Sequence, residues 1–330
     1  MAVLVTGGAG YIGSHMVHAL LDAGEQVVVL DDLSTGFRWA VAPQAAFVLG
    51  DVSDEALVKA VVAEHKIDAV IHFAARIVVP DSVADPLGYY LANTVKTRAL
   101  LEALVAAGVP QMIFSSTAAV YGMVGSEPVD EAAPLSPVSP YGRSKLMSEW
   151  MLADTAFAFP LRYVALRYFN VAGADPQGRT GQSTAGATHL LKVACETALG
   201  KRPGMDVYGT DYPTPDGTCL RDYIHVSDLV AAHLDALRHL RAGGESGVFN
   251  CGYGRGYSVL ELLEAVKRVS GVDFPVRFAD RRPGDPMAVV AKADRIRATL
   301  GWTPKLDDLD TIVRTALDWE RGLDARRAGG

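Results

Sequence analysis

Cysteine is scarce in this chain of 330 residues, and long apolar runs are absent. The three cysteines, Cys195, Cys219 and Cys251, are widely spaced and form no C-x-x-C pair, so we expect buried free thiols, neither a disulfide framework nor a metal site. No stretch reaches the roughly 18 consecutive apolar residues of a membrane-spanning helix. A strand-like run begins directly after Met1 and leaves no room for a signal peptide, so we expect a soluble, cytoplasmic protein.

An excess of positive charge is also lacking. The chain has 31 Lys and Arg against 38 Asp and Glu, a formal net charge of −7. This balance argues against nucleic acid or an anionic membrane as the main partner. An anionic ligand must therefore meet local arginines. The hydrophobic content of 49% is ample for a full core, and the length allows two domains.

Short apolar runs alternate with helical patterns through the first half of the chain. We expect strands at 2–6, 26–30, 46–49, 68–73, 111–115 and 162–168, and helices at 11–23, 54–65, 87–107 and 141–158. This alternation predicts an α/β fold with a Rossmann-type, doubly wound parallel sheet that is covered by helices on both faces.

The pattern changes after Phe169, where residues 170–181 are rich in Gly and polar residues and are typical of a loop. We therefore predict a nucleotide-binding domain at 1–169 and a smaller α/β substrate domain at 170–330, with part of 221–251 packing back on the sheet. Further strands are expected at 206–208, 222–226 and 247–250, and helices at 187–199, up to about 241, 258–270, 293–300 and 308–322.

A glycine-rich segment at residues 7–13 follows the first expected strand. Gly8, Gly10 and Gly13 fit the G-x-G-x-x-G template, in which glycines allow a tight turn, approach to a pyrophosphate and close helix–strand packing. Asp31 ends the next strand, about 20 residues on, where a carboxylate binds a ribose 2′-hydroxyl and repels a 2′-phosphate. The pattern predicts NAD rather than NADP. Asp51, after another strand-like run, is a weaker candidate for the adenine amino group.

Tyr141 and Lys145 stand four residues apart, downstream of the triplet Ser115-Ser116-Thr117. Positions i and i+4 share one face of a helix. We therefore expect the Lys145 ammonium to favour the Tyr141 phenolate and to bring its pKa from about 10 toward neutrality. A phenolate near neutral pH is a usable base, so these residues predict a proton-transfer site.

These motifs resemble the extended short-chain dehydrogenase/reductases and, within that family, the 4-epimerases of UDP-sugars. The similarity runs over nearly the whole chain and is carried by residues 5–15, 72–75, 114–122, 141–145, 166–170, 212–218 and 221–226. The last two segments are the most specific, since the glycine and Tyr-Lys motifs fit any relative of the wider family.

The resemblance implies a tightly held NAD that is reduced and reoxidised within each turnover. Tyr141 would take the proton of the sugar 4-hydroxyl while hydride leaves C4, and the 4-keto sugar would turn its other face before hydride returns. UDP-glucose and UDP-galactose would thus interconvert. Thr117 would hydrogen-bond the 4-oxygen, and Lys145 would also bind the nicotinamide ribose.

The resemblance also implies the remaining site residues. Cofactor-binding residues would be Gly7, Gly10, Tyr11, Ile12, Gly13, Asp31, Asp32, Asp51, Val52, Phe73, Ala74, Ala75, Asn93, Ser115, Tyr141, Lys145 and Tyr168. Substrate-binding residues would be Thr117, Tyr141, Asn170, His189, Tyr208, Arg221, Arg282, Asp285 and Val289, with Arg221 and Arg282 as clamps on the diphosphate. The role of His189, which is Asn in some members, stays open, and so does that of Ile77, where others carry a basic residue.

Two features bear on specificity and assembly. Val289 falls where some members carry a bulky tyrosine beside the sugar 2-position, and the smaller side chain leaves room for UDP-N-acetylhexosamines. The helical patterns at 89–107 and 141–157 are rich in Ala, Leu and Met. In a homodimer they would form a helical bundle, although burial inside one chain explains them equally well.

Other functions remain open from the residues alone. The same Tyr-Lys-Thr group would serve a 4-epimerase of UDP-glucuronate or of a UDP-pentose. A sugar-nucleotide dehydratase needs acidic residues directly after the Thr, whereas Thr117 is followed by Ala118 and Ala119. A non-catalytic NAD-binding sensor is disfavoured by the presence of Thr117, Tyr141 and Lys145 together.

Overall fold

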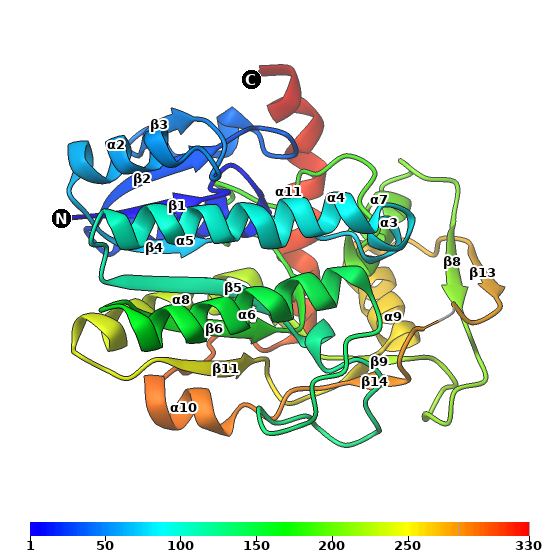
Figure 1. The fold of residues 1–330 in the computed structure, drawn as a ribbon. Coiled ribbons are helices and arrows are strands. Elements are labelled where there is room, and N and C mark those ends of the chain that lie inside the picture. The colour runs from blue at the N-terminus through cyan, green and yellow to red at the C-terminus, as the bar shows by residue number, and fades with distance from the viewer. Residues whose placement is uncertain (283, 330) are drawn as a thin grey trace.

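A seven-stranded parallel sheet forms the centre of the computed structural model, which describes residues 1–282 and 284–329 (Figure 1). Its strands are β1 (Ala2–Thr6), β2 (Gln26–Asp31), β3 (Ala46–Leu49), β4 (Ile67–His72), β5 (Gln111–Thr117), β6 (Arg162–Tyr168) and β11 (Gly247–Cys251). The spatial order is β11-β6-β5-β4-β1-β2-β3. The order reverses between β1 and β4, where doubly wound sheets form their ligand crevice. The predicted fold class is confirmed.

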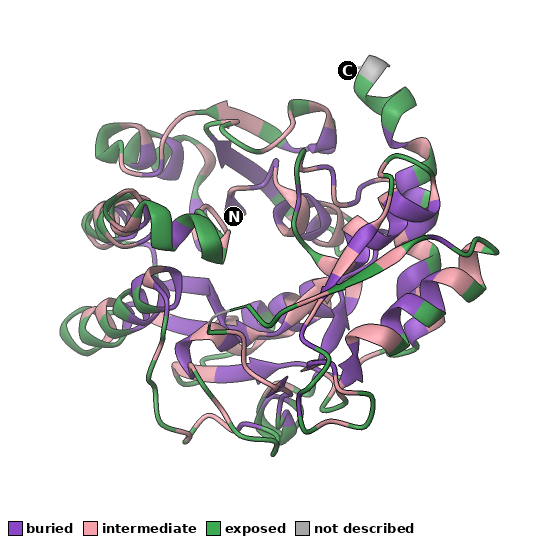
Figure 2. Cartoon of the chain, turned by 90° about the vertical axis from the view of Figure 1, so that its right-hand side faces the viewer, coloured by how far each residue is buried: buried purple, intermediate pink, exposed green. Residues whose placement is uncertain are grey.

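Helices cover both faces of this sheet, as Figure 2 shows by the buried strands between them. On one face, α1 (Tyr11–Asp22) packs beside α8 (Val226–Arg241). On the other face lie α2 (Glu55–His65), α5 (Lys96–Ala106) and α6 (Pro140–Ala158). Strands such as β1 are buried along their whole length, which explains why they appear in the sequence as continuous apolar runs.

The helix predicted at 87–107 is not uniform. It consists of α4 (Pro86–Tyr90), the π-helical turn η2 (Leu91–Val95) and α5, and a short helix α3 (Val79–Ala84) precedes it. The π turn buries Asn93. Single π turns within α-helices are frequent at functional sites.

The second half adds a smaller group of elements beside the carboxyl ends of the strands. Its core lies between α7 (Leu190–Ala198), α9 (Val259–Ser270) and α11 (Leu309–Gly329). A parallel ribbon of β8 (Met205–Tyr208) and β13 (Val276–Ala279) projects at the right of Figure 1. The remaining elements are η1 (Arg38–Ala40), η3 (Ala118–Val120), β12 (Tyr257–Ser258), β9 (Leu220–Arg221), β14 (Ala288–Val289) and α10 (Asp294–Leu300).

The loop predicted at 170–181 is partly wrong. Residues 170–172 form β7 (Asn170–Ala172), which pairs in parallel with β10 (Tyr223–His225). The strand predicted at 222–226 is shorter than expected because α8 begins at Val226. Both α8 and β11 lie on the seven-stranded sheet although they follow residue 169 in the chain. The division into domains at residue 169 stays a prediction.

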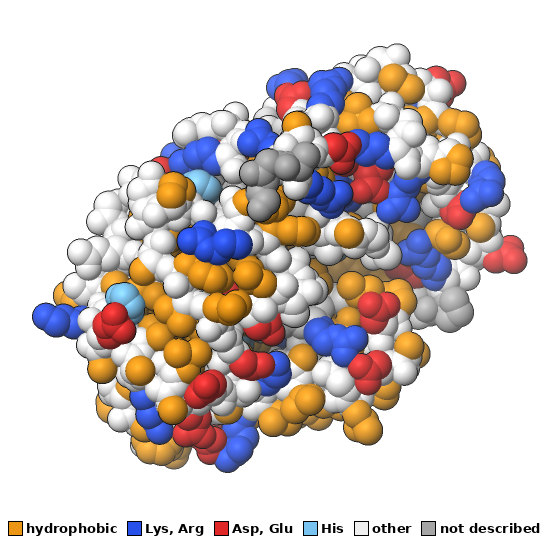
Figure 3. Space-filling view, turned by 90° about the horizontal axis from the view of Figure 1, so that it is seen from above, with side chains coloured by type: hydrophobic (Ala, Val, Ile, Leu, Met, Phe, Trp, Pro, Cys, Tyr) orange, Lys and Arg blue, Asp and Glu red, His pale blue; other side chains and the backbone are white. Residues whose placement is uncertain are grey.

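All three cysteines are free and buried. Within residues 1–282 and 284–329, no helix has the length and apolar character needed to cross a membrane. On the face drawn in Figure 3, basic and acidic side chains are interspersed with hydrophobic ones.

Candidate active site

The glycine-rich turn joins β1 to α1 at the switch point of the sheet. Gly7 has a φ of +70°, and a β-carbon there would lie 2.6 Å from the backbone nitrogen of Ala74. A β-carbon on Gly13 would lie 2.1 Å from the carbonyl oxygen of Gly7. Gly10 caps α1 without any side chain that binds the free N–H groups of the first turn. Such a helix N-terminus, lined by backbone that only glycine permits, fits a pyrophosphate.

Asp31 lies beside this turn at the end of β2. Its Oδ2 accepts a hydrogen bond of 2.9 Å from the backbone of Ala9, and its Oδ1 accepts one of 2.8 Å from Leu33. Burial raises the pKa of Asp31, and these two backbone hydrogen bonds oppose that rise. Asp32 accepts a hydrogen bond from Ser34. The carboxylate of Asp31 is thus held next to the segment that would carry the pyrophosphate.

Asp51 has a partner that the sequence did not predict. The Lys96 ammonium on α5 forms an ion pair with its Oδ2, and Ser53 donates two hydrogen bonds to its Oδ1. Burial acts to raise the pKa of Asp51, but the hydrogen bonds from Lys96 and Ser53 bring it below its usual value. Val52 is buried beside it. An adenine contact of Asp51 would have to share the carboxylate with Lys96, and it stays a prediction.

The segment Phe73–Ala75 follows β4 and packs against Gly7. Asn93, in the π turn, holds the next residue: its Oδ1 accepts from the backbone of Arg76 (2.8 Å), and its Nδ2 donates to the Arg76 carbonyl (2.9 Å). The same Nδ2 also donates to Ser144 on α6 (3.0 Å). Both amide hydrogens of Asn93 are therefore used to position this segment against α6.

Helix α6 carries Tyr141 and Lys145 to the carboxyl end of β5. It begins at Pro140, and the Ser139 side chain caps it by accepting from the backbone of Gly142. Tyr141, Lys145 and Thr117 are all buried. The Lys145 ammonium donates a hydrogen bond of 2.8 Å to the carbonyl oxygen of Ser115.

The pKa shifts of this pair correct one expectation. Burial raises the pKa of Tyr141 to about 12, although a hydrogen bond with Thr117 opposes the rise. Burial also lowers the pKa of Lys145 to about 7, against the opposing charge of Glu149. The expectation that Lys145 brings the Tyr141 phenol toward neutrality is therefore wrong for the protein groups alone, because burial dominates the Tyr141 pKa and Lys145 is not among the groups that shift it.

Tyr168 completes this edge of the sheet. It ends β6 directly beside Thr117, and its hydroxyl is hydrogen bonded to Ser115 Oγ. Burial raises its pKa far above the usual value. Tyr168 is thus a neutral hydroxyl next to the proton-transfer residues.

The predicted substrate residues lie around two pockets. In the first, Arg282 and Asp285 line an open groove with Met123, Tyr212 and Pro213. Arg282 stacks on the Tyr208 ring, with its guanidinium carbon 3.8 Å from the ring centroid.

Two further predicted residues adjoin this groove. Arg221 forms an ion pair with Asp285. Val289 lies opposite Arg221 in the pairing of β14 with β9. Five predicted substrate residues, with Tyr208 included, are thus brought together although up to 81 positions separate them in the chain.

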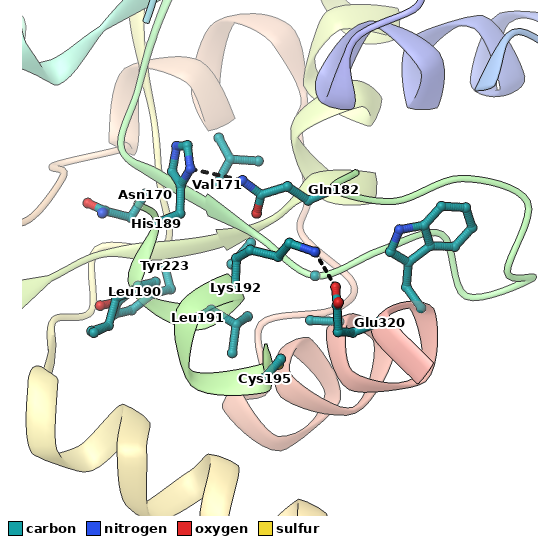
Figure 4. Close-up of a pocket in the computed structure, with 14 residues that line it drawn as sticks. Asn170, Val171, Gln182, His189, Leu190, Leu191, Lys192, Cys195, Tyr223 and Glu320 are labelled. Carbon is teal, nitrogen blue, oxygen red and sulfur yellow. Dashed lines mark hydrogen bonds and ion pairs between the residues drawn. The ribbon is translucent and has the colours of Figure 1, made fainter. Parts of the chain in front are cut away.

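The second pocket is lined by Asn170, His189 and Lys192 (Figure 4). The side chain of Gln182 is hydrogen bonded to His189 Nδ1 at 2.8 Å, and burial lowers the pKa of His189. Lys192 forms an ion pair with Glu320 of α11, which lines the same pocket. His189 is therefore a neutral group at the edge of this pocket.

Several buried polar residues of the site were missed from the sequence. Glu149 and Arg167 form a buried ion pair behind α6, and Arg167 also donates to Tyr121 (3.1 Å). Tyr121 in turn donates to Asn250 on β11 (2.6 Å). The only sequence signal was the position of Glu149, four residues after Lys145.

Known proteins share this fold and these motifs. The family model described as "NAD dependent epimerase/dehydratase family" matches residues 3–252. The UDP-glucose 4-epimerase of Azospirillum brasilense is 59% identical over 322 residues, covering 98% of this chain and 92% of the relative.

Two solved structures are also similar. The UDP-glucose 4-epimerase of Brucella ovis in complex with NAD is 45% identical, with a TM-score of 0.94 over 96% of this chain and 97% of that one. The UDP-Glc/GlcNAc 4-epimerase of Campylobacter jejuni is 49% identical, with a TM-score of 0.85 over 97% of this chain and 99% of that one. The resemblance deduced from the motifs is confirmed, and the chain belongs to the NAD-dependent epimerase/dehydratase family.

Proposed function

We propose that this chain is a UDP-glucose 4-epimerase that works with bound NAD. The observation that carries the proposal is the placement of Tyr141, Thr117 and Lys145 at the carboxyl end of β5, two strands from the glycine turn after β1. Relatives that carry this name are 46–59% identical over nearly the whole chain. NAD dependence is a property of the family.

The glycine turn and Asp31 are the residues that would hold the cofactor. Glycines at positions 7 and 13 leave the space that the backbone requires there, and the first turn of α1 has free N–H groups for the pyrophosphate. Asp31 would bind the adenosine ribose. When bound, oxidised NAD supplies a hydride acceptor and a positive charge.

Tyr141 would act as the base and then the acid at the sugar 4-oxygen. A phenol with a pKa of about 12 is a weak base at neutral pH, so additional positive charge in the loaded site is needed to favour its anion. Lys145 contributes one such charge when protonated. Thr117 would hold the 4-oxygen while charge develops on it. After the sugar ring turns, Tyr141 would return the proton, and the 4-configuration is inverted.

We further propose that UDP-N-acetylhexosamines are accepted. Val289 is small, and its pairing with Arg221 sets it at the edge of the proposed substrate groove. The similarity to a UDP-Glc/GlcNAc 4-epimerase supports this breadth. UDP-glucuronate and UDP-pentoses remain the alternative substrates.

We also propose a homodimer through α4, η2 and α6. Leu87, Leu91 and Val95 are exposed and follow one another at intervals of four residues on α4 and η2. On the neighbouring α6, Trp150 is 56% exposed and Phe157 is 95% exposed. Exposed apolar side chains that are gathered on one face are typical of a protein interface. A second copy of the same face would bury them in a helical bundle.

The deciding experiment is NMR of the purified protein with UDP-galactose and without added NAD. Appearance of UDP-glucose at equilibrium would establish a 4-epimerase that carries its own cofactor. Unchanged UDP-galactose, with bound NAD verified after denaturation, would exclude this substrate. The same assay with UDP-GlcNAc, UDP-glucuronate and UDP-xylose then tests the breadth and the alternatives.

A further inference from the structure

Glu149 lies one helical turn beyond Lys145 on α6 and is buried together with Arg167 of β6. Both side chains are only 4% exposed. The guanidinium contacts both carboxylate oxygens, with Nη2 at 2.6 Å from Oε2 and Nε at 3.0 Å from Oε1. A buried ion pair costs desolvation energy and is weak evidence for a stabilising role. Stability alone does not account for this pair, which lies beside Ser116 and close to Lys145.

Three side chains of α6 contact the carboxyl end of β5. Tyr141 is hydrogen bonded to Thr117, and Lys145 donates to the carbonyl of Ser115. One turn further on, Glu149 accepts a hydrogen bond from the Ser116 hydroxyl. Helix positions i, i+4 and i+8 thus contact three consecutive residues of one strand. Glu149 is the last of these three attachments, and it brings the only negative charge among them.

We propose that Glu149 is a positioning residue for the epimerisation, which keeps Lys145 protonated and holds Ser116 so that Thr117 stays in register with Tyr141. The inference deepens the proposed function and rests on it. The hydrogen-bond partners of Glu149 are Ser116 and Arg167, and in this proposal it acts through Lys145 and Ser116.

The charges around Lys145 agree with this assignment. Burial lowers the pKa of Lys145 to about 7, and Glu149 is the group that opposes this fall. His72 on β4 is buried, with a pKa lowered to about 3, so it is neutral near neutral pH. The Phe114 ring of β5 lies 4.8 Å from the ammonium, and the carbonyl of Ser115 accepts its hydrogen bond. Without Glu149, the protonated form of Lys145 would lose its stabilising carboxylate.

The test is Glu149→Gln, assayed for UDP-galactose turnover across pH 5.5 to 9. Lys145 is protonated below its pKa, and removal of the carboxylate lowers that pKa further. Activity should therefore be lost at lower pH than in the parent protein, by about one pH unit, the usual effect of a nearby opposite charge. A readout independent of turnover is NMR titration of the lysine ζ-amines, with Lys145→Met to assign the signal. The Lys145 titration should shift in the same direction.

Glu149→Asp is the matched control, because it keeps the negative charge. Its activity should be lost at the same alkaline pH as that of the parent protein. If Glu149→Gln does not fold, the double variant Glu149→Gln/Arg167→Met removes both charges of the pair and leaves no buried charge unpaired. A neutral variant that folds, retains NAD and titrates at Lys145 like the parent would overturn the proposal. A parent protein without activity on any of the four UDP-sugars would instead reject the epimerase function, while the NMR titration would still decide the effect of Glu149 on Lys145.

Discussion

The Lys145 ammonium donates its hydrogen bond to the Ser115 carbonyl, 2.8 Å away, and is thereby fastened to the strand that also carries Thr117. Tyr141 reaches that strand through Thr117 itself. The phenol and the ammonium are thus anchored separately. The Tyr141 hydroxyl can be removed without releasing Lys145 or the glycine turn.

Tyr141→Phe should reduce turnover of UDP-galactose by about 10²- to 10⁴-fold, the usual contribution of a general acid–base group. NAD released on denaturation should stay at the parent level. Tyr163→Phe is the control. Tyr163 lies near the amino end of β6, away from the site at the carboxyl end, so this variant should retain activity. Activity of Tyr141→Phe within a few-fold of the parent would reject Tyr141 as the proton-transfer group.

Gly13→Ala should abolish NAD retention and lower the free energy of unfolding. The added β-carbon would lie 2.1 Å from the Gly7 carbonyl oxygen, so the turn must move. Bound NAD after purification and the urea midpoint are the measurements. Gly125→Ala, where no atom lies within 4 Å of the new carbon, should leave both unchanged. Normal NAD content in Gly13→Ala would mean that the turn does not hold the cofactor.

Val289→Tyr should discriminate between substrates. A bulky ring beside the sugar 2-position should lower kcat/KM for UDP-GlcNAc by at least about tenfold and leave that for UDP-galactose nearly unchanged. Val289→Ala is the control and should keep both activities. Equal losses for both substrates would show that position 289 does not contact the sugar 2-substituent.

Trp150→Glu should dissociate the proposed homodimer, because it would bury an unpaired charge in the interface. Sedimentation of the parent and the variant measures the change in mass. Phe278→Glu is the control: Phe278 is 64% exposed on the β8–β13 ribbon, away from α6, and its replacement should leave the dimer intact. A monomeric parent would contradict the proposal directly.

Acid should destabilise the fold through its buried histidines. Burial lowers the pKa of His72 to about 3 and that of His233 to about 4, whereas the unfolded chain binds these protons near pH 6.5. The free energy of unfolding is therefore unaffected by these histidines above pH 6.5. It decreases as the pH falls from 6.5 toward the pKa values of the folded protein, by up to about 1.4 kcal/mol per pH unit for each group. Urea unfolding between pH 4.5 and 7.5 measures this slope.

His72→Gln should flatten the dependence of stability on pH by about one proton. Identical slopes for the parent and this variant would assign the acid sensitivity to other groups.

Local patterns in the sequence were sufficient for the central sheet. Strands buried on both faces must be apolar throughout, and β1, β2 and β5 were recognisable for that reason. Short strands such as β7 and β14 form because a distant segment offers a partner, and nothing in their own residues shows it. The π turn at 91–95 was missed for a similar reason, since its apolar residues fit an ordinary helix.

The same distinction applies to the site. The glycine motif, the Tyr141–Lys145 pair and Asp31 could be recognised in the sequence, because their chemistry requires a fixed spacing along the chain. The pairing of Asp51 with Lys96 and of Arg221 with Asp285 depends on tertiary structure, which no spacing records. Desolvation is equally invisible, and it reversed the expected direction of the Tyr141 pKa.

Strand β11 lies at one margin of the sheet and hydrogen bonds to β6, although 78 residues separate Tyr168 from Gly247. A polypeptide cut after residue 169 would leave the whole length of β6 without its neighbour. An exposed apolar edge strand pairs readily with strands of other molecules. We therefore expect the amino-terminal half to aggregate when it is expressed alone. The amino-terminal half therefore depends on the second half of the chain to complete the edge of its own sheet.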